Sequence, residues 1–218
     1  VTLFMVLLSA YHVLLYHYTG QDDMIVGIPI AGRRHPDVYG MIGMFINTLP
    51  VRCFLDASAS FTKHLIQVKR LSLEAYQNQD YPFDKLVNAI GTRGRTQENP
   101  LFNVMFNLQD KNMEEKQLDH LQFEHIDVDF HISKFDLTLN AVREPDCISF
   151  ELEYNANIFS DVAVQKLAGY YLYIIEQVLN KKNVAVREMQ LLPPKELSRI
   201  IEWGTGMNTE YPDNSNLY

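Results

Sequence analysis

Apolar residues recur at helical spacing in three long stretches of the chain. The first covers residues 1–18 and ends before Gly20, a residue type that commonly follows helix C-termini. Because polar residues interrupt this stretch, we expect a helix that is buried on most sides and not a membrane span, which needs about 20 consecutive apolar residues. The second stretch covers residues 61–78, and the third begins after Ser160, a favourable N-cap.

Other stretches alternate between apolar and polar residues, or are apolar between turn residues, as strands are. The clearest two, residues 135–141 and 148–154, are separated by a turn and predict an antiparallel hairpin with one solvent-exposed face. Further strands are expected over residues 24–30, 41–52, 101–108 and 121–130, the last with a bulge near Glu124. A short edge strand over residues 184–192 and short helices over residues 82–90 and 195–202 complete the expected elements.

The stretch of residues 41–52 carries an unusual polar pair, Asn47 and Thr48, inside an apolar run that ends after Pro50. We expect this run to be a core strand. A buried amide beside a buried hydroxyl needs hydrogen-bond partners. Two interpretations follow from the residues alone: the pair either braces the backbone or faces a ligand.

Three charged residues are candidates for specific contacts. Arg33 and Arg34 follow Gly32 at the end of an expected strand, and guanidinium groups match the oxygen geometry of phosphate. A solvated turn is the alternative interpretation of this segment. Asp136 alternates away from the apolar residues beside it, so we interpret it as a charged anchor or, more simply, as a partner in a structural salt bridge.

The histidines and cysteines form no recognisable catalytic or metal-binding motif. All seven histidines occur singly, and Cys53 and Cys147 lie far apart without the spacing of metal ligands. We therefore interpret His12 and His17 as ordinary core or surface residues, and we expect no metal site and no catalytic residue in this chain. Two reduced thiols fit a cytoplasmic protein, and a single disulfide is the alternative.

Composition and charge narrow the function classes further. With 218 residues, 47% of them hydrophobic, the chain can bury a substantial core. It has 19 basic and 27 acidic residues and no dense basic cluster, which disfavours nucleic-acid binding. Val1 already lies inside an apolar helical run and residues 208–218 are polar, so we expect the chain to be a piece of a longer protein with a linker at its end.

Six stretches together resemble, in order, motifs in the C-terminal half of the condensation domains of nonribosomal peptide synthetases. They are residues 3–8 (LFMVLL), 26–33 (VGIPIAGR), 42–49 (IGMFINTL), 78–87 (NQDYPFDKLV), 99–106 (NPLFNVMF) and 134–139 (KFDLTL). The resemblance covers residues 1–192. Residues 193–218 resemble the linker that joins such a domain to a following adenylation domain.

The resemblance implies a fold and a reaction. The fold would be α/β (α+β), one lobe of a chloramphenicol-acetyltransferase-like clamp, with a mixed β-sheet flanked by helices and a tunnel between two such lobes. In the intact domain, an amine and a thioester carried on the phosphopantetheine arms of two carrier proteins react to form an amide. The family's His-His-x-x-x-Asp-Gly motif lies in the first lobe and is absent here, so the chain alone should be inactive and should bind no cofactor directly.

The resemblance also implies site residues and partners. Asn47 and Thr48 would line or brace the tunnel, and Arg33 and Arg34 would contact pantetheine or a carrier protein. Expected partners are the N-terminal lobe, donor and acceptor carrier proteins and a downstream adenylation domain. The alternatives are a noncatalytic scaffold that docks carriers or neighbouring domains, and an epimerisation domain of the same fold. The remaining motif residues, expected to be structural, are Pro82, Phe83, Asp84, Asn99, Pro100, Phe102 and Asp136.

Overall fold

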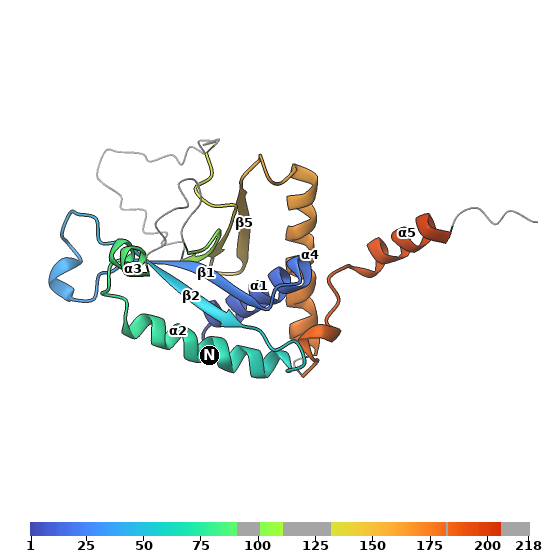
Figure 1. The fold of residues 1–218 in the computed structure, drawn as a ribbon, viewed down its shortest axis with the longest axis horizontal. Helices are drawn as coiled ribbons and strands as arrows, with labels where there is room; N and C mark the ends of the chain where they lie inside the picture. The colour runs from blue at the N-terminus through green and yellow to red at the C-terminus, as the bar shows by residue number, and fades with distance from the viewer. Residues whose placement is uncertain (91–100, 111–131, 182, 206–218) are drawn as a thin grey trace, which may run out of the picture.

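The computed structural model describes residues 1–90, 101–110, 132–181 and 183–205. In this part of the chain, five strands and five α-helices follow one another with two short 3-10 helices between them (Figure 1). Their bounds are α1 (Leu3–Thr19), β1 (Asp23–Ile30), η1 (Pro36–Val38), β2 (Asn47–Phe54), α2 (Phe61–Gln77), α3 (Phe83–Ile90), β3 (Val104–Asp110), β4 (Leu137–Arg143), β5 (Ile148–Tyr154), α4 (Asp161–Asn180), η2 (Val186–Glu188) and α5 (Pro194–Thr205).

The strands form one mixed sheet in the order β2-β1-β3-β4-β5. β1 is antiparallel to β2 and parallel to β3, β3 is parallel to β4, and β4 and β5 form an antiparallel pair. The register of the first pair runs from Asp23 opposite Phe54 to Ile30 opposite Asn47. The pairing therefore ends at Asn47, directly beside the turn that carries Arg33 and Arg34. The mixed sheet flanked by helices is the fold class that the resemblance implies.

The long helices cover the sheet as their apolar faces require. α1 contacts β3, α2 and α4, while α2 packs against β2 and α4 against β5. α1 is capped by Thr2, whose side chain accepts a hydrogen bond from the backbone of Met5, and by Gly20 in the left-handed conformation (φ 73°). Ten residues of α1 are buried, which confirms the expected core helix. Within the described residues, the apolar character and length of every helix fall short of what a membrane crossing needs.

Most predicted elements are confirmed, including the hairpin of β4 and β5. The exposed positions of β5 are Ser149, Glu151 and Glu153, which form the expected wet face. Ser160 caps α4 by accepting a hydrogen bond from the backbone N–H of Ala163. The predicted strand over residues 121–130 lies outside the described residues.

The predicted strand over residues 41–52 is wrong in its first half. β2 begins only at Asn47, and the residues before it are irregular and largely exposed, including Met44 at 89% exposure. The physical reason is the end of the partner strand: β1 stops at Ile30, and Gly32 then turns the chain away with φ 65°. Without a neighbouring strand, the apolar residues 41–46 have no ladder to join.

The predicted edge strand over residues 184–192 is also wrong. Only an isolated bridge between Ser60 and Ala185 forms there, and η2 follows immediately. The backbone N–H groups of Val186 and Arg187 donate instead to the carbonyls of Ala59 and Ala57 in the loop before α2. The helix expected after this segment is confirmed as α5, which extends away from the sheet at the end opposite α3 (Figure 1).

Candidate functional site

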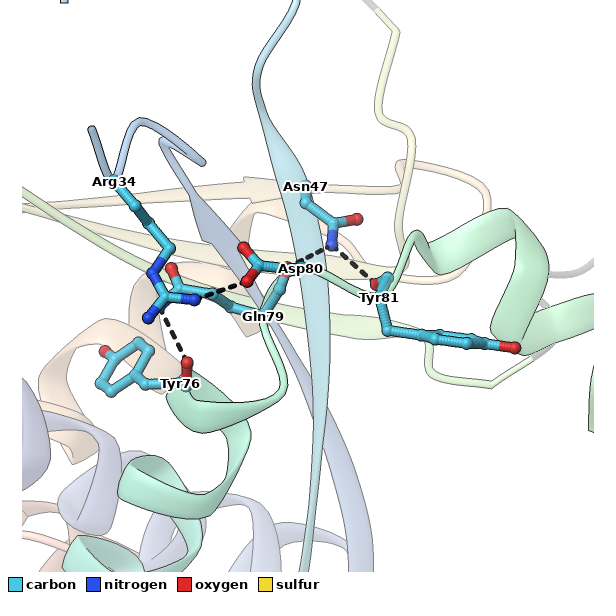
Figure 2. A network of polar contacts seen from close by, with 6 residues as sticks. All are labelled: Arg34, Asn47, Tyr76, Gln79, Asp80 and Tyr81. Carbon is cyan, nitrogen blue, oxygen red and sulfur yellow. Dashed lines mark hydrogen bonds and ion pairs between the residues drawn. The ribbon is translucent and has the colours of Figure 1, made fainter. Parts of the chain in front are cut away.

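The residues singled out in the sequence meet at one end of the β1–β2 pair. The turn between these strands and the connection between α2 and α3 lie there together, beside α3 (Figure 1). We call this region the Asn47 corner and define it by Arg34, Asn47, Gln79, Asp80, Tyr81 and Phe83. Most of these side chains are drawn in Figure 2.

Asn47 is the central residue of the corner. Its Nδ2 group donates to the backbone carbonyls of Gln79 and Tyr81, each at 2.9 Å (Figure 2). Its Oδ1 accepts from the backbone N–H of Phe83 at 3.1 Å. The side chain thus uses both of its N–H donors and its carbonyl oxygen on a loop more than thirty residues away in sequence. This arrangement fixes the connection between α2 and α3 to the first residue of β2, which is a bracing geometry. Thr48, the next residue, is half-buried and lies opposite Pro29 of β1.

Arg34 ties the other side of the corner together. Its Nη1 lies 2.5 Å from Oδ2 of Asp80, and Gln79 Nε2 donates to the carbonyl of Tyr76 at 2.8 Å (Figure 2). Both charged side chains of the ion pair are more than half exposed. An exposed pair contributes only about 0–1 kcal/mol and is screened by salt. Arg34 therefore positions the turn weakly and keeps its guanidinium accessible.

Arg33 is used inside the turn itself. Its Nη1 donates to the carbonyl of Val38, and its guanidinium lies over the ring of Phe45, 4.2 Å from the ring centroid. The neighbouring Gly32 makes this closure feasible: a Cβ at that position would lie 1.9 Å from the carbonyl oxygen of Phe45. Arg33 and Arg34 thus have different environments, and only Arg34 is exposed at the surface of the corner.

An aromatic stack supports the corner from below. The ring of Phe102 lies 5.5 Å from that of Phe83 and 5.4 Å from that of Phe135, measured between centroids. Gly27 of β1 is required for this stack, because a Cβ there would come within 2.2 Å of the Phe102 ring. Through these ring contacts, Phe83 and Phe102 pack the start of α3 against the segment before β3, which is a structural role.

The other motif residues have separate positions. The carbonyl of Pro82 accepts from the backbone N–H of Leu86 at the start of α3, and Asp84 lies in the first turn of that helix, where a negative charge is favourable. The backbone N–H of Asp136 donates to the carbonyl of Asn103 at 2.9 Å. Within the described part of the chain, the carboxylate of Asp136 is in none of the ion pairs, so the salt bridge that we expected is not found there. Asn99 and Pro100 lie outside the described residues.

A second group of polar residues lies inside the core, and no motif or spacing in the sequence predicts it. His12 of α1, Cys53 of β2 and His64 of α2 are all buried, and their ligand atoms lie within 4.8 Å of one another. We call these three residues the core His–Cys cluster. The two imidazole rings meet edge to face with centroids 5.6 Å apart. Both cysteines of the chain are free thiols, so the alternative of a disulfide is wrong.

Burial perturbs every titratable group of the core His–Cys cluster. It holds the pKa of His12 well below its ordinary value, with a smaller contribution from the nearby His64, and it lowers the pKa of His64 to about 4. The Ser9 backbone opposes the shift of His64. Burial, together with the negative charge of Asp23, raises the pKa of the Cys53 thiol to about 12. All three side chains are therefore neutral at pH 7. The sequence hid the cluster because its members are contributed by three elements, and only the packing of α1, β2 and α2 brings them together.

Comparison with known proteins identifies the family. The family model described as "Condensation domain" matches residues 1–201. Gramicidin S synthase 2 of Brevibacillus brevis is 40% identical over 211 residues, which is 97% of this chain and 5% of that protein. Tyrocidine synthase 3 of Brevibacillus parabrevis is 42% identical over 195 residues, 89% of this chain and 3% of that protein. The chain therefore spans only a small part of the length of these relatives.

Solved structures share the fold. Holo-AB3403, a four-domain nonribosomal peptide synthetase bound to AMP and glycine, matches with a TM-score of 0.82 at 19% identity, over 90% of this chain and 16% of that chain. The X-domain from teicoplanin biosynthesis matches with a TM-score of 0.79 at 23% identity, over 88% of this chain and 44% of that one. The matched family model, the similar synthases and the shared fold agree with the motifs read from the sequence: the chain belongs to the condensation domain family of nonribosomal peptide synthetases.

Proposed function

We propose that this chain is the second lobe of a condensation domain that forms amide bonds between substrates carried as thioesters. One observation carries the proposal: the chain matches the X-domain and the starter condensation domain of rhizomide synthetase over 88% of its own length but over only 44% and 45% of theirs. That proportion supports half of a two-lobed domain. The absence of His-His-x-x-x-Asp-Gly from the sequence supports the assignment to the lobe without the reactive histidines.

The proposed reaction places two carrier-bound substrates end to end. The amine of the acceptor attacks the carbonyl carbon of the donor thioester, so that a C–N bond forms and the C–S bond breaks. The nitrogen loses a proton, and the departing sulfur takes up a proton and leaves as a thiol. Most of the rate of such a reaction comes from holding the two reactants in a productive geometry. Both thioesters arrive on phosphopantetheine arms of partner carrier proteins, so this chain supplies walls and positioning and not a proton-transfer group.

Within that function, the Asn47 corner is the proposed contribution of this lobe to the tunnel wall. Asn47 fixes the relative positions of the β1–β2 turn and the α2–α3 connection through three backbone hydrogen bonds. Thr48 would then border the tunnel at the start of β2. Arg34, whose partner Asp80 is an exposed carboxylate, is available to exchange that partner for the phosphate of a pantetheine arm.

The experiment reunites the chain with its upstream lobe and supplies donor and acceptor carriers loaded with aminoacyl groups. Amide product, followed by mass spectrometry of the acceptor carrier, is expected from the reunited domain and not from residues 1–218 alone. The matched control is the reunited domain with the first-lobe histidines replaced by alanine. Product formed by the isolated chain would overturn the proposal.

A second candidate function is a noncatalytic docking module. A structure with this fold, the X-domain, has been solved in complex with OxyB, at a TM-score of 0.79 and 23% identity to this chain. That likeness concerns the fold alone, but it gives the docking interpretation a specific precedent. An upstream lobe without His-His-x-x-x-Asp-Gly, combined with carrier binding that yields no amide, would favour docking. An epimerisation domain would instead convert the stereocentre of a single carrier-bound residue, which chiral analysis of the product distinguishes.

A further inference from the structure

The imidazole nitrogens of the core His–Cys cluster lack well-formed hydrogen bonds within the described part of the chain. Nδ1 and Nε2 of both His12 and His64 are buried, and none of them forms a hydrogen bond of ordinary geometry with a described residue. The backbone of Ser9 comes close enough to the His64 ring to oppose the lowering of its pKa, so that contact is a weak one. Each neutral imidazole carries one donor and one acceptor. A buried polar atom without a partner costs about 1–3 kcal/mol, so folded proteins contain few of them, and an unseen ion or water is one of their ordinary explanations.

The chemistry of the three side chains selects one class of ligand. A thiol and two imidazoles, all neutral and placed on three different elements, form an N₂S donor set. Thiolate and imidazole are the donors preferred by zinc and cuprous copper, whereas magnesium and calcium take oxygen donors. Asp23, the carboxylate whose charge reaches Cys53, is held by two hydrogen bonds from Arg52, at 2.9 and 2.6 Å, and so is already paired.

The geometry points to a metal site: we infer that His12, Cys53 and His64 bind one soft or borderline d¹⁰ ion, Zn²⁺ or Cu⁺, in the core between α1, β2 and α2. Bond lengths of about 2.0–2.1 Å to nitrogen and about 2.3 Å to sulfur require ligand atoms roughly 3.3–3.6 Å apart in a tetrahedral arrangement. The ligand atoms lie within 4.8 Å of one another, so they would have to approach by at most about 1.5 Å to reach these separations.

Metal binding exchanges the proton of the Cys53 thiol for the ion and changes no oxidation state. The S–H bond of Cys53 breaks, its proton leaves to solvent, and the thiolate and one lone pair from each imidazole bind the ion. The imidazole nitrogens that do not bind the ion keep their hydrogens, and the backbone of Ser9 already lies near the ring of His64, as the outer partner of a metal-bound histidine commonly does. The site would tie two helices to the sheet, and the inference does not depend on amide formation.

The test loads the chain during refolding, because the site is closed to solvent. Residues 1–218 are unfolded in denaturant with reductant, refolded with one equivalent of Zn²⁺ or, without oxygen, of Cu⁺, and passed over a desalting column before elemental analysis. About one ion per chain is expected for wild type with at least one of the two metals. Cys53→Ala and the double variant His12→Leu/His64→Leu should retain at least about tenfold less, since losses of 10–100-fold follow even from altering outer partners of a metal ligand.

Matched controls separate this site from adventitious binding. Cys147→Ser and His35→Asn remove an exposed thiol and an exposed imidazole, and both should retain metal as wild type does. Cobalt provides a readout that does not depend on the folding of a variant of the buried site: Co²⁺ bound to wild type should show thiolate-to-metal charge-transfer absorption, and this absorption should persist when the exposed thiol is removed in Cys147→Ser. Wild type that retains neither zinc nor copper, or bound cobalt without a thiolate band, would overturn the inference.

Discussion

The two ends of strand β2 treat their polar side chains in opposite ways. At its start, Asn47 satisfies three backbone groups of a distant loop. Near its end, Cys53 lies with His12 and His64, and none of the four imidazole nitrogens forms a well-formed hydrogen bond with a described residue. The difference teaches how to interpret a polar residue in an otherwise apolar strand. Where the fold supplies the partners, the residue is explained by bracing, and where it supplies none, the residue points to something that binds.

The largest expected effect is a loss of stability in acid that originates at the core His–Cys cluster. The pKa of His64 is lowered from its ordinary value to about 4 by burial, so between about pH 6.5 and 4 the unfolded chain binds more protons than the folded one. The stabilisation is therefore fully present above about pH 6.5 and is lost as the pH falls, by roughly 3 kcal/mol for His64. His12, shifted in the same direction, adds to the loss.

Urea unfolding of the metal-free chain at a series of pH values checks this prediction. Exposed carboxylates with lowered pKa values, such as Asp23 and Asp56, also lose stabilising contacts in acid. The His12→Leu/His64→Leu variant keeps those carboxylates and removes only the imidazoles. A pH dependence between 6.5 and 4 that is identical in wild type and variant would show that the histidines do not cause it.

The next largest effect is expected from Asn47→Ala. The substitution removes three hydrogen bonds and leaves the carbonyls of Gln79 and Tyr81 and the N–H of Phe83 without that partner. A net loss of about 2 kcal/mol in the free energy of unfolding follows from roughly 0.5–1.5 kcal/mol per bond, reduced by access of water at this edge of the fold. In the reunited domain, amide formation should fall by more than this stability loss explains.

Single-turnover kinetics at a temperature where both proteins are folded measure the second part of that prediction. Asn78→Ala is the matched control, because Asn78, the C-cap of α2, also donates a side-chain hydrogen bond to a backbone carbonyl, but to that of Glu74 in the last turn of the helix that it caps. Wild-type turnover by Asn47→Ala would remove Asn47 from the site and leave it a purely structural residue.

The contrast also shows which features a sequence reveals. The Gly20 cap of α1 and the Ser160 cap of α4 were predicted because these residues act on backbone groups a few residues away, whereas the cap that Thr2 forms was not predicted. The polar pair at residues 47 and 48 was noticeable because it interrupts an apolar run. The length of β2 was not predictable, since it is set by the end of its partner β1. The core His–Cys cluster was hidden for the same reason, because nothing in the spacing of residues 12, 53 and 64 says that their elements adjoin.

A smaller effect, of opposite sign, is expected from His12→Leu/His64→Leu in the metal-free chain. Replacing two unpaired imidazoles by apolar side chains of similar size removes a desolvation cost, so the free energy of unfolding at pH 7 should rise by about 1–2 kcal/mol. Zinc should then stabilise wild type and leave the variant unchanged. Thermal unfolding of both proteins with and without the metal measures this, and a variant that is less stable than metal-free wild type would mean that the imidazoles have partners after all.

The smallest effect is expected from Arg34→Ala, and its size is what makes the variant informative. The Arg34–Asp80 pair is exposed on both sides, with side-chain exposures of 55% and 73%, so its loss should cost at most about 1 kcal/mol and less at high salt. Arg70→Ala is a close control, because Arg70 forms a similarly exposed pair with Glu74 at 2.8 Å on α2. Equal small changes in stability are expected for the two variants.

Only Arg34→Ala should weaken the binding of a carrier protein bearing phosphopantetheine, measured by titration at low and high salt, since phosphate can replace Asp80 as the partner of this guanidinium. Equal carrier binding by both variants would assign Arg34 to the turn alone.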